Sequence, residues 1–297
     1  MRKSKQVLLY VLSIAFVVLW MQYSTHITIS IEKLINGGEF FQRSIGSPFF
    51  KDNMLNFIYG LLEPAVNTFF YFLLSITVVY LSNTKEGLKN YFGEISSLFT
   101  KKPIKSLLFG LYVPFLTHVT VILLPGIHIA SLFYVKSQVD IIEGWLFWLE
   151  ILQVFVLAFY EELIIRVFIY KGYSKALNNT FALLFSLSLF TILHENRLGG
   201  IGLNGLSDFQ LYMIQVPYYF SAGFLYIYLL DSRQSFWTSL GAHFSVNYFF
   251  ARALNADLED GIFVIILITI SQTIYVLLDY FARYKFGEKI SEEVKTL

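Results

Sequence analysis

The sequence predicts an all-α fold, a polytopic transmembrane helix bundle of about eight spans, from three observations. Hydrophobic residues make up 56% of the 297 residues and charged residues only 14%, and the mean hydropathy of +0.60 lies far above that of a soluble domain. Apolar runs close to the roughly 20 residues that cross a bilayer recur along the chain. The charged residues cluster between these runs.

The apolar runs predict eight spans in order along the chain. The first lies within "MRKSKQVLLYVLSIAFVVLW", which starts like a signal peptide but has no small-residue cleavage site after it, so an uncleaved span is expected. Asn178 and Asn179 predict the turn of a helical hairpin between the fourth and fifth spans. The spans are expected around residues 6–23, 55–81, 104–124, 144–170, 179–194, 210–230, 235–253 and 261–282.

Residues 1–297 are expected to form a single membrane domain, because the chain contains no internal repeat, low-complexity tract or long linker. Within it, residues 1–143 supply the first three spans with their loops and carry little ionisable chemistry. Residues 144–282 form the helical core and carry nearly all of the ionisable groups inside spans.

The positions of the charges predict the topology. The segment "LSNTKEGLKNYFGEISSLFTKKPIK" between the second and third spans is rich in lysine, and both chain ends are basic, whereas "NADLED" before the last span is acidic. The positive-inside rule then places both termini in the cytoplasm, which an even number of spans allows. We expect a multi-pass plasma-membrane protein, and the high usage of Phe, Ile, Tyr and Asn favours a bacterial source.

Composition also excludes several classes of function. The formal net charge of +1 gives no indication of a nucleic-acid partner. The chain contains no cysteine, which excludes a thiol nucleophile, disulfides, thiolate metal ligands and lipidation of the protein through cysteine.

Three charged residues lie inside the apolar stretch "FYEELIIRVFIY". Ionisable groups inside spans are costly and normally face a protein interior or a wet cavity. Glu162 and Arg166 are four residues apart on one helix face, so they are predicted to pair. Glu161 points about 100° away, so the same arginine is not expected to neutralise it, and it is the glutamate predicted to take part in chemistry.

Two further polar clusters follow within the core. In "FTILHEN", Phe190 and His194 are four residues apart at the end of the fifth span. In "GAHFSVNYFF", His243 and Asn247 are four apart and are predicted to project from one face of the seventh span. The aromatic run "VPYYFSAGFLYIY" in the sixth span is interpreted as helix packing and interface belt.

The hairpin geometry predicts that Glu161 and His194 face each other. Both lie about 16 to 17 residues from the turn, roughly 24 Å at 1.5 Å per residue. A carboxylate in a low-dielectric cavity can act as a general base, and with a histidine it can hold and deprotonate one water. His243 and Asn247 can supply hydrogen-bond donors to an oxyanion, so this set of groups favours amide hydrolysis.

These residues resemble, in order, the three motifs of the CPBP (Abi) family, the CAAX protease and bacteriocin-processing membrane proteins related to the Ras-converting enzyme. The motifs are Glu161-Glu162-x-x-x-Arg166, Phe190-x-x-x-His194 and His243-x-x-x-Asn247. The resemblance covers about residues 144–253. Each motif alone is weak, but all three in order inside apolar helices are specific.

The resemblance implies an eight-helix intramembrane glutamate protease that needs neither a metal nor another cofactor. It assigns water activation to Glu161 and His194 and the oxyanion hole to His243 and Asn247. It assigns structural support to Glu162, Arg166 and Phe190. The expected partners are the lipid bilayer and a membrane-embedded or lipid-modified peptide, such as a prenylated CAAX tail, a bacteriocin leader or a quorum-sensing peptide.

Three alternatives remain from the sequence. A glutamate and two histidines could bind zinc, although the helical H-E-x-x-H spacing is absent. Members of the family can also act without proteolysis, as immunity factors or as scaffolds for membrane protein partners. A proton-relaying transporter is disfavoured, because no interrupted helices recur in two matching halves.

Overall fold

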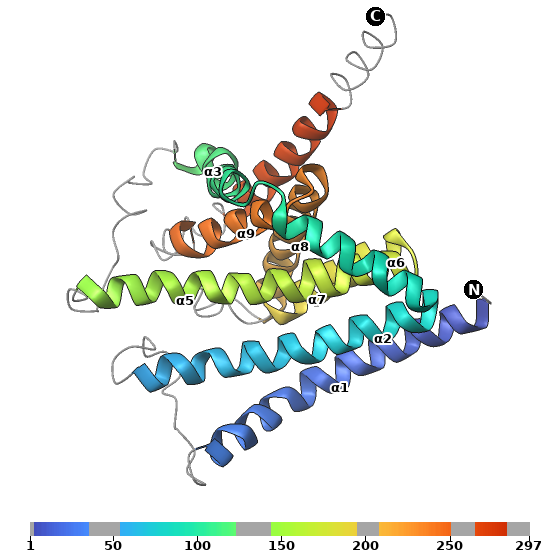
Figure 1. The fold of residues 1–297 in the computed structure, drawn as a ribbon. Helices are drawn as coiled ribbons and strands as arrows, with labels where there is room; N and C mark the ends of the chain where they lie inside the picture. Colours follow the sequence, from blue (N-terminus) through green and yellow to red (C-terminus); the bar gives the residue numbers. More distant parts are fainter. Residues whose placement is uncertain (1–2, 36–53, 123–143, 195–207, 251–264, 284–297) are drawn as a thin grey trace, which may run out of the picture. The chain divides into compact units, whose positions relative to one another are not determined.

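The computed structural model describes five stretches of the chain, drawn as coloured ribbons in Figure 1. These stretches are residues 3–35, 54–122, 144–194, 208–250 and 265–283. They are helical apart from short turns and contain no strand, which confirms the all-α prediction for this part of the chain. The elements are α1 (Lys3–Ile35), α2 (Met54–Thr100), α3 (Pro103–Ile122), α5 (Gly144–Glu162), the π-helix η1 (Leu163–Lys171), α6 (Gly172–Ala176), α7 (Asn179–Leu193), α8 (Asp208–Arg233), α9 (Phe236–Ser245), the π-helix η3 (Val246–Phe250) and a final helix, Ile265–Arg283.

Each of the eight predicted spans overlaps a helix in the described residues. Those long and apolar enough to cross a bilayer are Pro64–Ser82, Tyr212–Arg233 and Ile265–Arg283. Shorter apolar helical stretches occupy Val7–Trp20, Pro103–Thr117 and Asn179–Leu193. The chain therefore has the helices of a membrane protein, while the count of eight spans stays a prediction.

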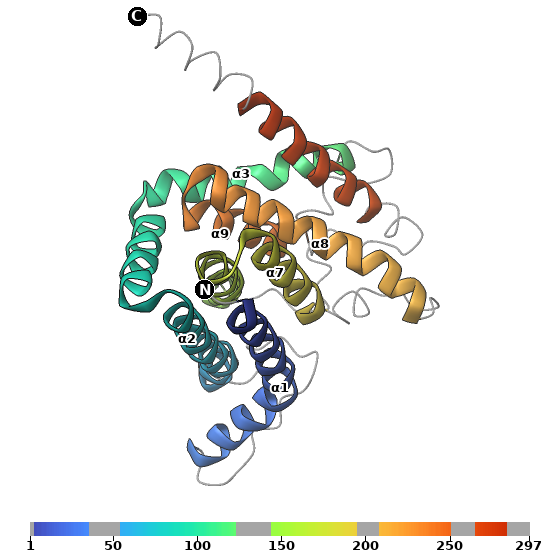
Figure 2. The same cartoon turned by 90° about the vertical axis from the view of Figure 1, so that its right-hand side faces the viewer.

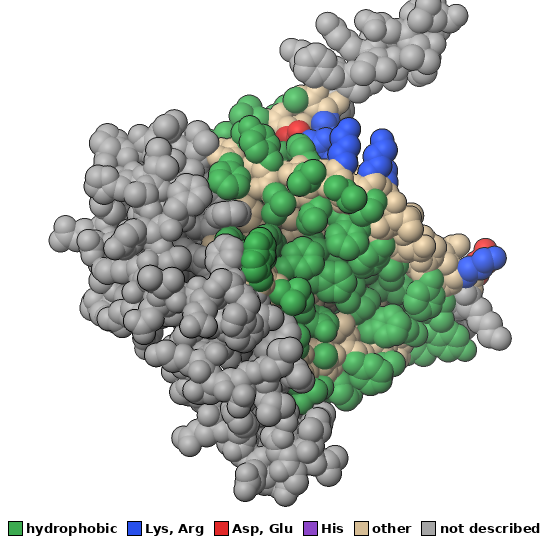
Figure 3. All heavy atoms as spheres, turned by 60° about the vertical axis from the view of Figure 1, so that its left-hand side comes forward, with side chains coloured by type: hydrophobic (Ala, Val, Ile, Leu, Met, Phe, Trp, Pro, Cys, Tyr) green, Lys and Arg blue, Asp and Glu red, His purple; other side chains and the backbone are tan. Residues whose placement is uncertain are grey.

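Large apolar side chains are exposed on several helices. Val7 and Val11 of α1 are more than half exposed, as are Leu278 and Phe281 of the final helix. Figure 3 shows apolar side chains gathered on one face, with Lys and Arg side chains near its border. Exposed apolar surface of this kind suits contact with lipid, and basic groups at its edge suit the membrane interface.

Internal contacts group the chain into two compact units. The first unit comprises Met1–Leu98 and Ile141–Ser186, and the second comprises Phe99–Asp140 and Leu187–Leu297. Each unit thus combines residues from both sides of the boundary expected at residue 143. The division falls inside α2 and α7. The single-domain organisation and the boundary at residue 143 stay predictions.

In the first unit, helix α2 bends back on itself. Ser75 Oγ and Tyr91 Oη lie 2.7 Å apart across 16 residues of sequence. In a straight α-helix this separation corresponds to roughly 24 Å, far beyond the reach of the two side chains. The change of direction is visible in Figures 1 and 2. The lysine-rich segment expected to be a connection between spans is therefore helical and forms the bend and the second arm of α2.

The second arm of α2 is joined to the segment after η1 by ion pairs. Glu94 lies 3.2 Å from Lys171 Nζ and 2.9 Å from Lys175 Nζ. Partial burial opposes ionisation of Glu94, but the two ammonium groups outweigh it and hold the pKa of Glu94 below its usual value. The resulting stabilisation is present at neutral pH and is lost as the pH falls through the lowered pKa of Glu94.

Helix α1 contacts both α2 and the hairpin of the first unit. Trp20 Nε1 donates a hydrogen bond to Asn67 Oδ1 at 2.7 Å. The Tyr10 hydroxyl accepts a hydrogen bond from Asn178 Nδ2 at 2.6 Å. Asn178 Oδ1 in turn accepts from the Phe181 amide at 2.7 Å and so caps the start of α7. The break between α6 and α7 at this asparagine confirms the predicted hairpin turn.

In the second unit, α3 and α9 cross at two glycines. A Cβ atom on Gly110 would overlap the carbonyl oxygen of Thr238, and one on Gly241 would overlap that of Leu107. Small residues permit this approach of two helix backbones, which provides the packing that apolar burial alone does not supply in a bilayer. His243 lies two residues beyond Gly241, so the crossing fixes the segment that carries it.

Helix α8 and the final helix run parallel in the second unit. Ser221 Oγ donates to Gln272 Oε1 at 2.8 Å, and Tyr228 Oη donates to Asp279 Oδ2 at 2.6 Å. Both pairs are 51 residues apart in sequence, so the two helices advance in the same direction. The parallel direction of these two helices agrees with the predicted order of the last three spans, in which one span lies between them in the sequence.

We expect Gly241→Ala to destabilise the protein, because the added methyl group would force α3 and α9 apart. Overpacking of this kind costs about 1–3 kcal/mol. The melting temperature of the purified protein in detergent measures the effect. Gly93→Ala is the matched control, since a Cβ there meets no described atom within 4 Å and alanine favours the helix. Equal melting temperatures of the two variants would contradict the close packing.

Candidate active site

Helix α5 does not continue as an α-helix beyond Glu162. It passes into η1, a nine-residue π-helix over Leu163–Lys171. π-helical segments are rare and occur frequently at functional sites. The sequence correctly predicts a helical span across this region, but its apolar pattern gives no indication of the change from α to π geometry.

Glu162 and Arg166 form a buried ion pair at this junction. The Glu162 Oε1 and Arg166 Nη2 atoms lie 3.4 Å apart, and neither side chain has exposed surface. The pairing predicted from their spacing is therefore confirmed. Each charge would be costly to bury alone, so the pair is what allows the helix to carry both into an apolar interior.

Glu161 has different surroundings from its neighbour in the sequence. It is the penultimate residue of α5 and is only partly buried, whereas Glu162 is completely buried. Arg166 forms an ion pair with Glu162. The two adjacent carboxylates thus occupy distinct environments, which agrees with the distinction drawn from the sequence.

His194 directly follows the last residue of α7 and is buried. Its Nδ1 atom lies 2.7 Å from the carbonyl oxygen of Phe190. A carbonyl can only accept a hydrogen bond, so Nδ1 carries the proton in this contact. Nε2 of the neutral ring then keeps its lone pair. The ring is also held by aromatic contacts, with centroids 4.2 Å from Phe190 and 4.8 Å from Tyr219.

His243 lies in α9 and is almost completely buried. Its ring stacks on Tyr226 with centroids 4.8 Å apart and planes at 18°. The Phe190 ring lies at 79° to the same ring, with centroids 5.8 Å apart. Phe190 therefore contacts both histidine rings, and both rings are restrained by packing in the second unit.

Asn247 lies in η3, which begins at Val246, and is partly buried. The four-residue spacing between His243 and Asn247 thus crosses from an α-helix into a π-helix. The two side chains need not share a face as they would in a continuous α-helix. Their common projection stays a prediction.

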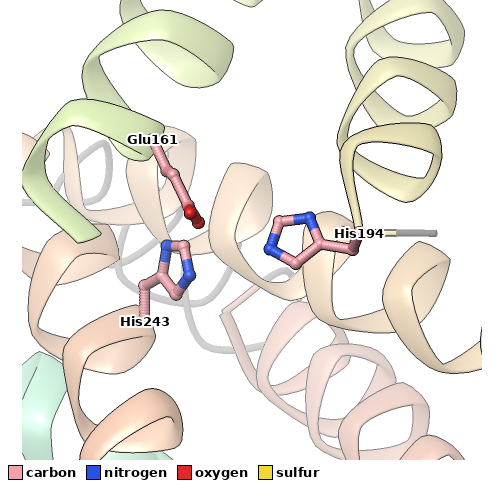
Figure 4. A group of neighbouring side chains, drawn as sticks. All are labelled: Glu161, His194 and His243. Carbon is pink, nitrogen blue, oxygen red and sulfur yellow. The ribbon is translucent and has the colours of Figure 1, made fainter. Parts of the chain in front are cut away.

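Glu161, His194 and His243 form a group of neighbouring side chains, drawn in Figure 4. One carboxylate oxygen and one nitrogen of each ring lie within 4.8 Å of one another. The side chains come from α5, the end of α7 and α9, and they point toward one another. A carboxylate and two imidazoles can hold a water by hydrogen bonds, and they are also ligands that zinc accepts.

Residues 143–249 match the family model described as type II CAAX prenyl endopeptidase Rce1-like. The resemblance inferred from the three motifs is confirmed. The match to this Rce1-like family runs from the start of α5 into η3 and includes all of the predicted site residues. It covers just over a third of the chain and leaves α1, α2 and α3 outside. No curated protein and no solved structure matches the chain.

The sequence did not identify the two tyrosines that pack on the histidine rings. Tyr219 and Tyr226 lie in the aromatic run of α8, which was interpreted as packing and interface belt. They are seven residues apart, two helical turns, and so share one face of the helix. That spacing is the sequence feature that could have identified them, but it is also common in ordinary apolar helices.

We expect Glu162→Gln to destabilise the protein strongly, because it leaves the Arg166 charge buried without its carboxylate. Breaking a buried pair costs about 3–5 kcal/mol. Thermal unfolding in detergent measures the loss. Glu94→Gln is the matched control, because its partly exposed pairs with Lys171 and Lys175 are expected to contribute about 1 kcal/mol or less. A larger loss in the control would contradict this account.

Proposed function

We propose that this protein is an intramembrane glutamate-type endopeptidase that hydrolyses a peptide bond in a membrane-associated or lipid-modified peptide. The observation that carries the proposal is the group formed by Glu161, His194 and His243 within a segment that matches an endopeptidase family. The protein acts without a metal or another cofactor.

In the proposed reaction, Glu161 and His194 hold and activate one water. The Nδ1 contact of His194 with the Phe190 carbonyl leaves the Nε2 lone pair to accept a hydrogen bond from that water. Glu161 takes a proton as the water oxygen adds to the scissile carbonyl carbon. The tetrahedral intermediate then collapses, the C–N bond breaks, and the proton passes from Glu161 to the departing amine.

The negative charge that develops on the carbonyl oxygen requires donors in the same place. We assign these to an N–H of His243 and the side-chain amide of Asn247. Stacking on Tyr226 holds the His243 ring in one orientation, which supports a preorganised donor. Glu162, Arg166 and Phe190 act as supports, and their burial and contacts favour this assignment.

A site built on apolar helices favours a substrate that reaches it from the bilayer. The family name points to prenylated CAAX tails, and leader or signalling peptides also suit such a site. We propose that the protein resides in a bacterial plasma membrane with cytoplasmic termini, as the distribution of lysine and arginine indicates. A membrane protein partner fits the same location.

Glu161→Gln is expected to lower turnover by roughly 10²- to 10⁴-fold, since it removes the base while keeping the shape of the side chain. The turnover of His194→Ala and of His243→Ala should fall by a comparable factor. Cleavage is measured by mass spectrometry in liposomes, on a farnesylated CAAX peptide and its unlipidated counterpart. Glu94→Gln, which lies outside the proposed catalytic group, should retain wild-type turnover. Undiminished turnover in folded Glu161→Gln would refute the assignment.

Zinc hydrolysis is the second candidate, favoured by the ligand set of Glu161, His194 and His243. The metal-independent proposal expects no stoichiometric zinc in the active purified protein and no loss of cleavage after treatment with a chelator. Elemental analysis and activity before and after chelation measure both. One zinc per chain together with activity restored by added zinc would favour the metal reaction.

A scaffold or immunity role makes a different forecast in the cell. If proteolysis is the physiological role, replacing the gene with the Glu161→Gln variant should reproduce the phenotype of deleting it. Membrane levels of the variant are checked by immunoblot. A wild-type phenotype in the variant, with a clear phenotype in the deletion strain, would establish that a non-proteolytic role suffices.

A further inference from the structure

Two hydroxyl groups of α2 reach the backbone of η1 inside the first unit. Ser75 Oγ donates to the Phe168 carbonyl at 2.8 Å, and Tyr91 Oη lies 3.3 Å from the Val167 carbonyl oxygen. The two hydroxyl oxygens lie 2.7 Å apart, so the single Tyr91 proton is shared between Ser75 Oγ and the more distant Val167 carbonyl. Both side chains are completely buried. Burial raises the pKa of Tyr91, so its hydroxyl keeps the proton that it donates.

These bonds lie close to the end of η1, where the helix geometry leaves a backbone carbonyl without a backbone donor. A π-helix pairs each carbonyl with the amide five residues on, and an α-helix with the amide four residues on. Where η1 passes into α6, the register of donors shifts, and a carbonyl near the junction loses its backbone donor. The Gly172 amide bonds to the Ile169 carbonyl, which directly follows the two carbonyls that the α2 hydroxyls contact. In an apolar interior such a carbonyl needs a partner within the protein.

The close approach of α2 to this junction depends on Gly172. A Cβ atom there would overlap Ser75 Oγ. The φ angle of Gly172 is −60°, which any residue adopts, so glycine is needed for space and not for conformation. The Phe72 and Phe168 rings, 5.1 Å apart, pack beside the same contact. The bend of α2 brings Ser75 from its first arm and Tyr91 from its second arm to one point.

We propose that Ser75 and Tyr91 are positioning residues that hold η1 in its π-helical form and thereby fix the direction of the carboxylate of Glu161. A change of register in η1 would shift the residues after Glu162 relative to α5, which carries Glu161 next to its last residue. Both hydroxyls belong to α2, outside the segment that matches the Rce1-like family. Helix α2 thus contributes to catalysis by positioning residues of the matched segment. This inference rests on the proposed peptidase function.

Ser75→Ala and Tyr91→Phe are the test variants, since each removes one hydroxyl and little else. Thr77→Ala and Tyr80→Phe are matched controls on the same helix. Thr77 bonds within α2 to Leu73 O at 2.8 Å, and Tyr80 is half exposed. We expect kcat to fall about 10-fold or more in the test variants with KM little changed, because misplacement of a catalytic group affects the transition state most. The pH profile of kcat should shift, and both controls should match wild type.

The double variant Ser75→Ala, Tyr91→Phe adds a check. The two hydroxyls form one network, so their effects on kcat should not add. Folding is monitored through the melting temperature. A lower melting temperature with an unchanged kcat and pH profile would assign the hydroxyls a structural role alone and overturn the proposal. Unchanged kinetics and stability would overturn it too.

Hydrogen exchange of the amides in residues 163–172 supplies a readout that does not need activity. The test variants should exchange faster there than wild type and than both controls. Without the hydroxyls that hold its backbone, the hydrogen bonds of η1 would open more often. Wild-type exchange rates in the test variants would overturn the proposal. If wild-type protein cleaves neither peptide probe, the proposed function fails, and exchange alone then decides whether the hydroxyls hold η1.

Discussion

A polar group in the apolar interior of this protein needs a hydrogen-bonding or charged partner inside the protein. Lipid tails and packed apolar side chains cannot replace the hydrogen bonds that water would make. The Glu162–Arg166 ion pair meets this requirement for two charges at the junction of α5 and η1. The Ser75 hydroxyl meets it for the Phe168 carbonyl of η1, and Tyr91 supports Ser75 by a hydrogen bond between the two hydroxyls. The bend of α2 brings these two hydroxyls to one place.

The same requirement shapes the two histidines. His194 donates Nδ1–H to a carbonyl of its own helix, and this bond sets which nitrogen faces away from the helix. His243 is held instead by stacking on Tyr226 and by the nearly perpendicular ring of Phe190. Restraint of this kind suits chemistry, because a base or an oxyanion donor acts best when it need not reorganise during the reaction.

Close packing of helix backbones at glycines is the second feature on which the structure depends. Gly110 and Gly241 let α3 and α9 meet backbone to backbone, and Gly172 gives Ser75 access to η1. Packing of this type replaces part of the hydrophobic driving force that is absent between helices in lipid. Each of the three glycines is needed for the space that a side chain would fill. The segments carrying His243 and the Glu162–Arg166 pair are thereby held against their neighbours.

The sequence by itself determined the helical class, the hairpin turn at Asn178, the Glu162–Arg166 pair and the family resemblance, because each depends on composition or on neighbours within a few residues. It did not determine the π-helices, the bend of α2 or the packing of Tyr219 and Tyr226 on the histidine rings. Those features depend on contacts between residues far apart in the chain, such as Tyr91 with Val167. Every residue has a backbone carbonyl, so the sequence does not show which carbonyls take part in such contacts. Only the tertiary structure decided them.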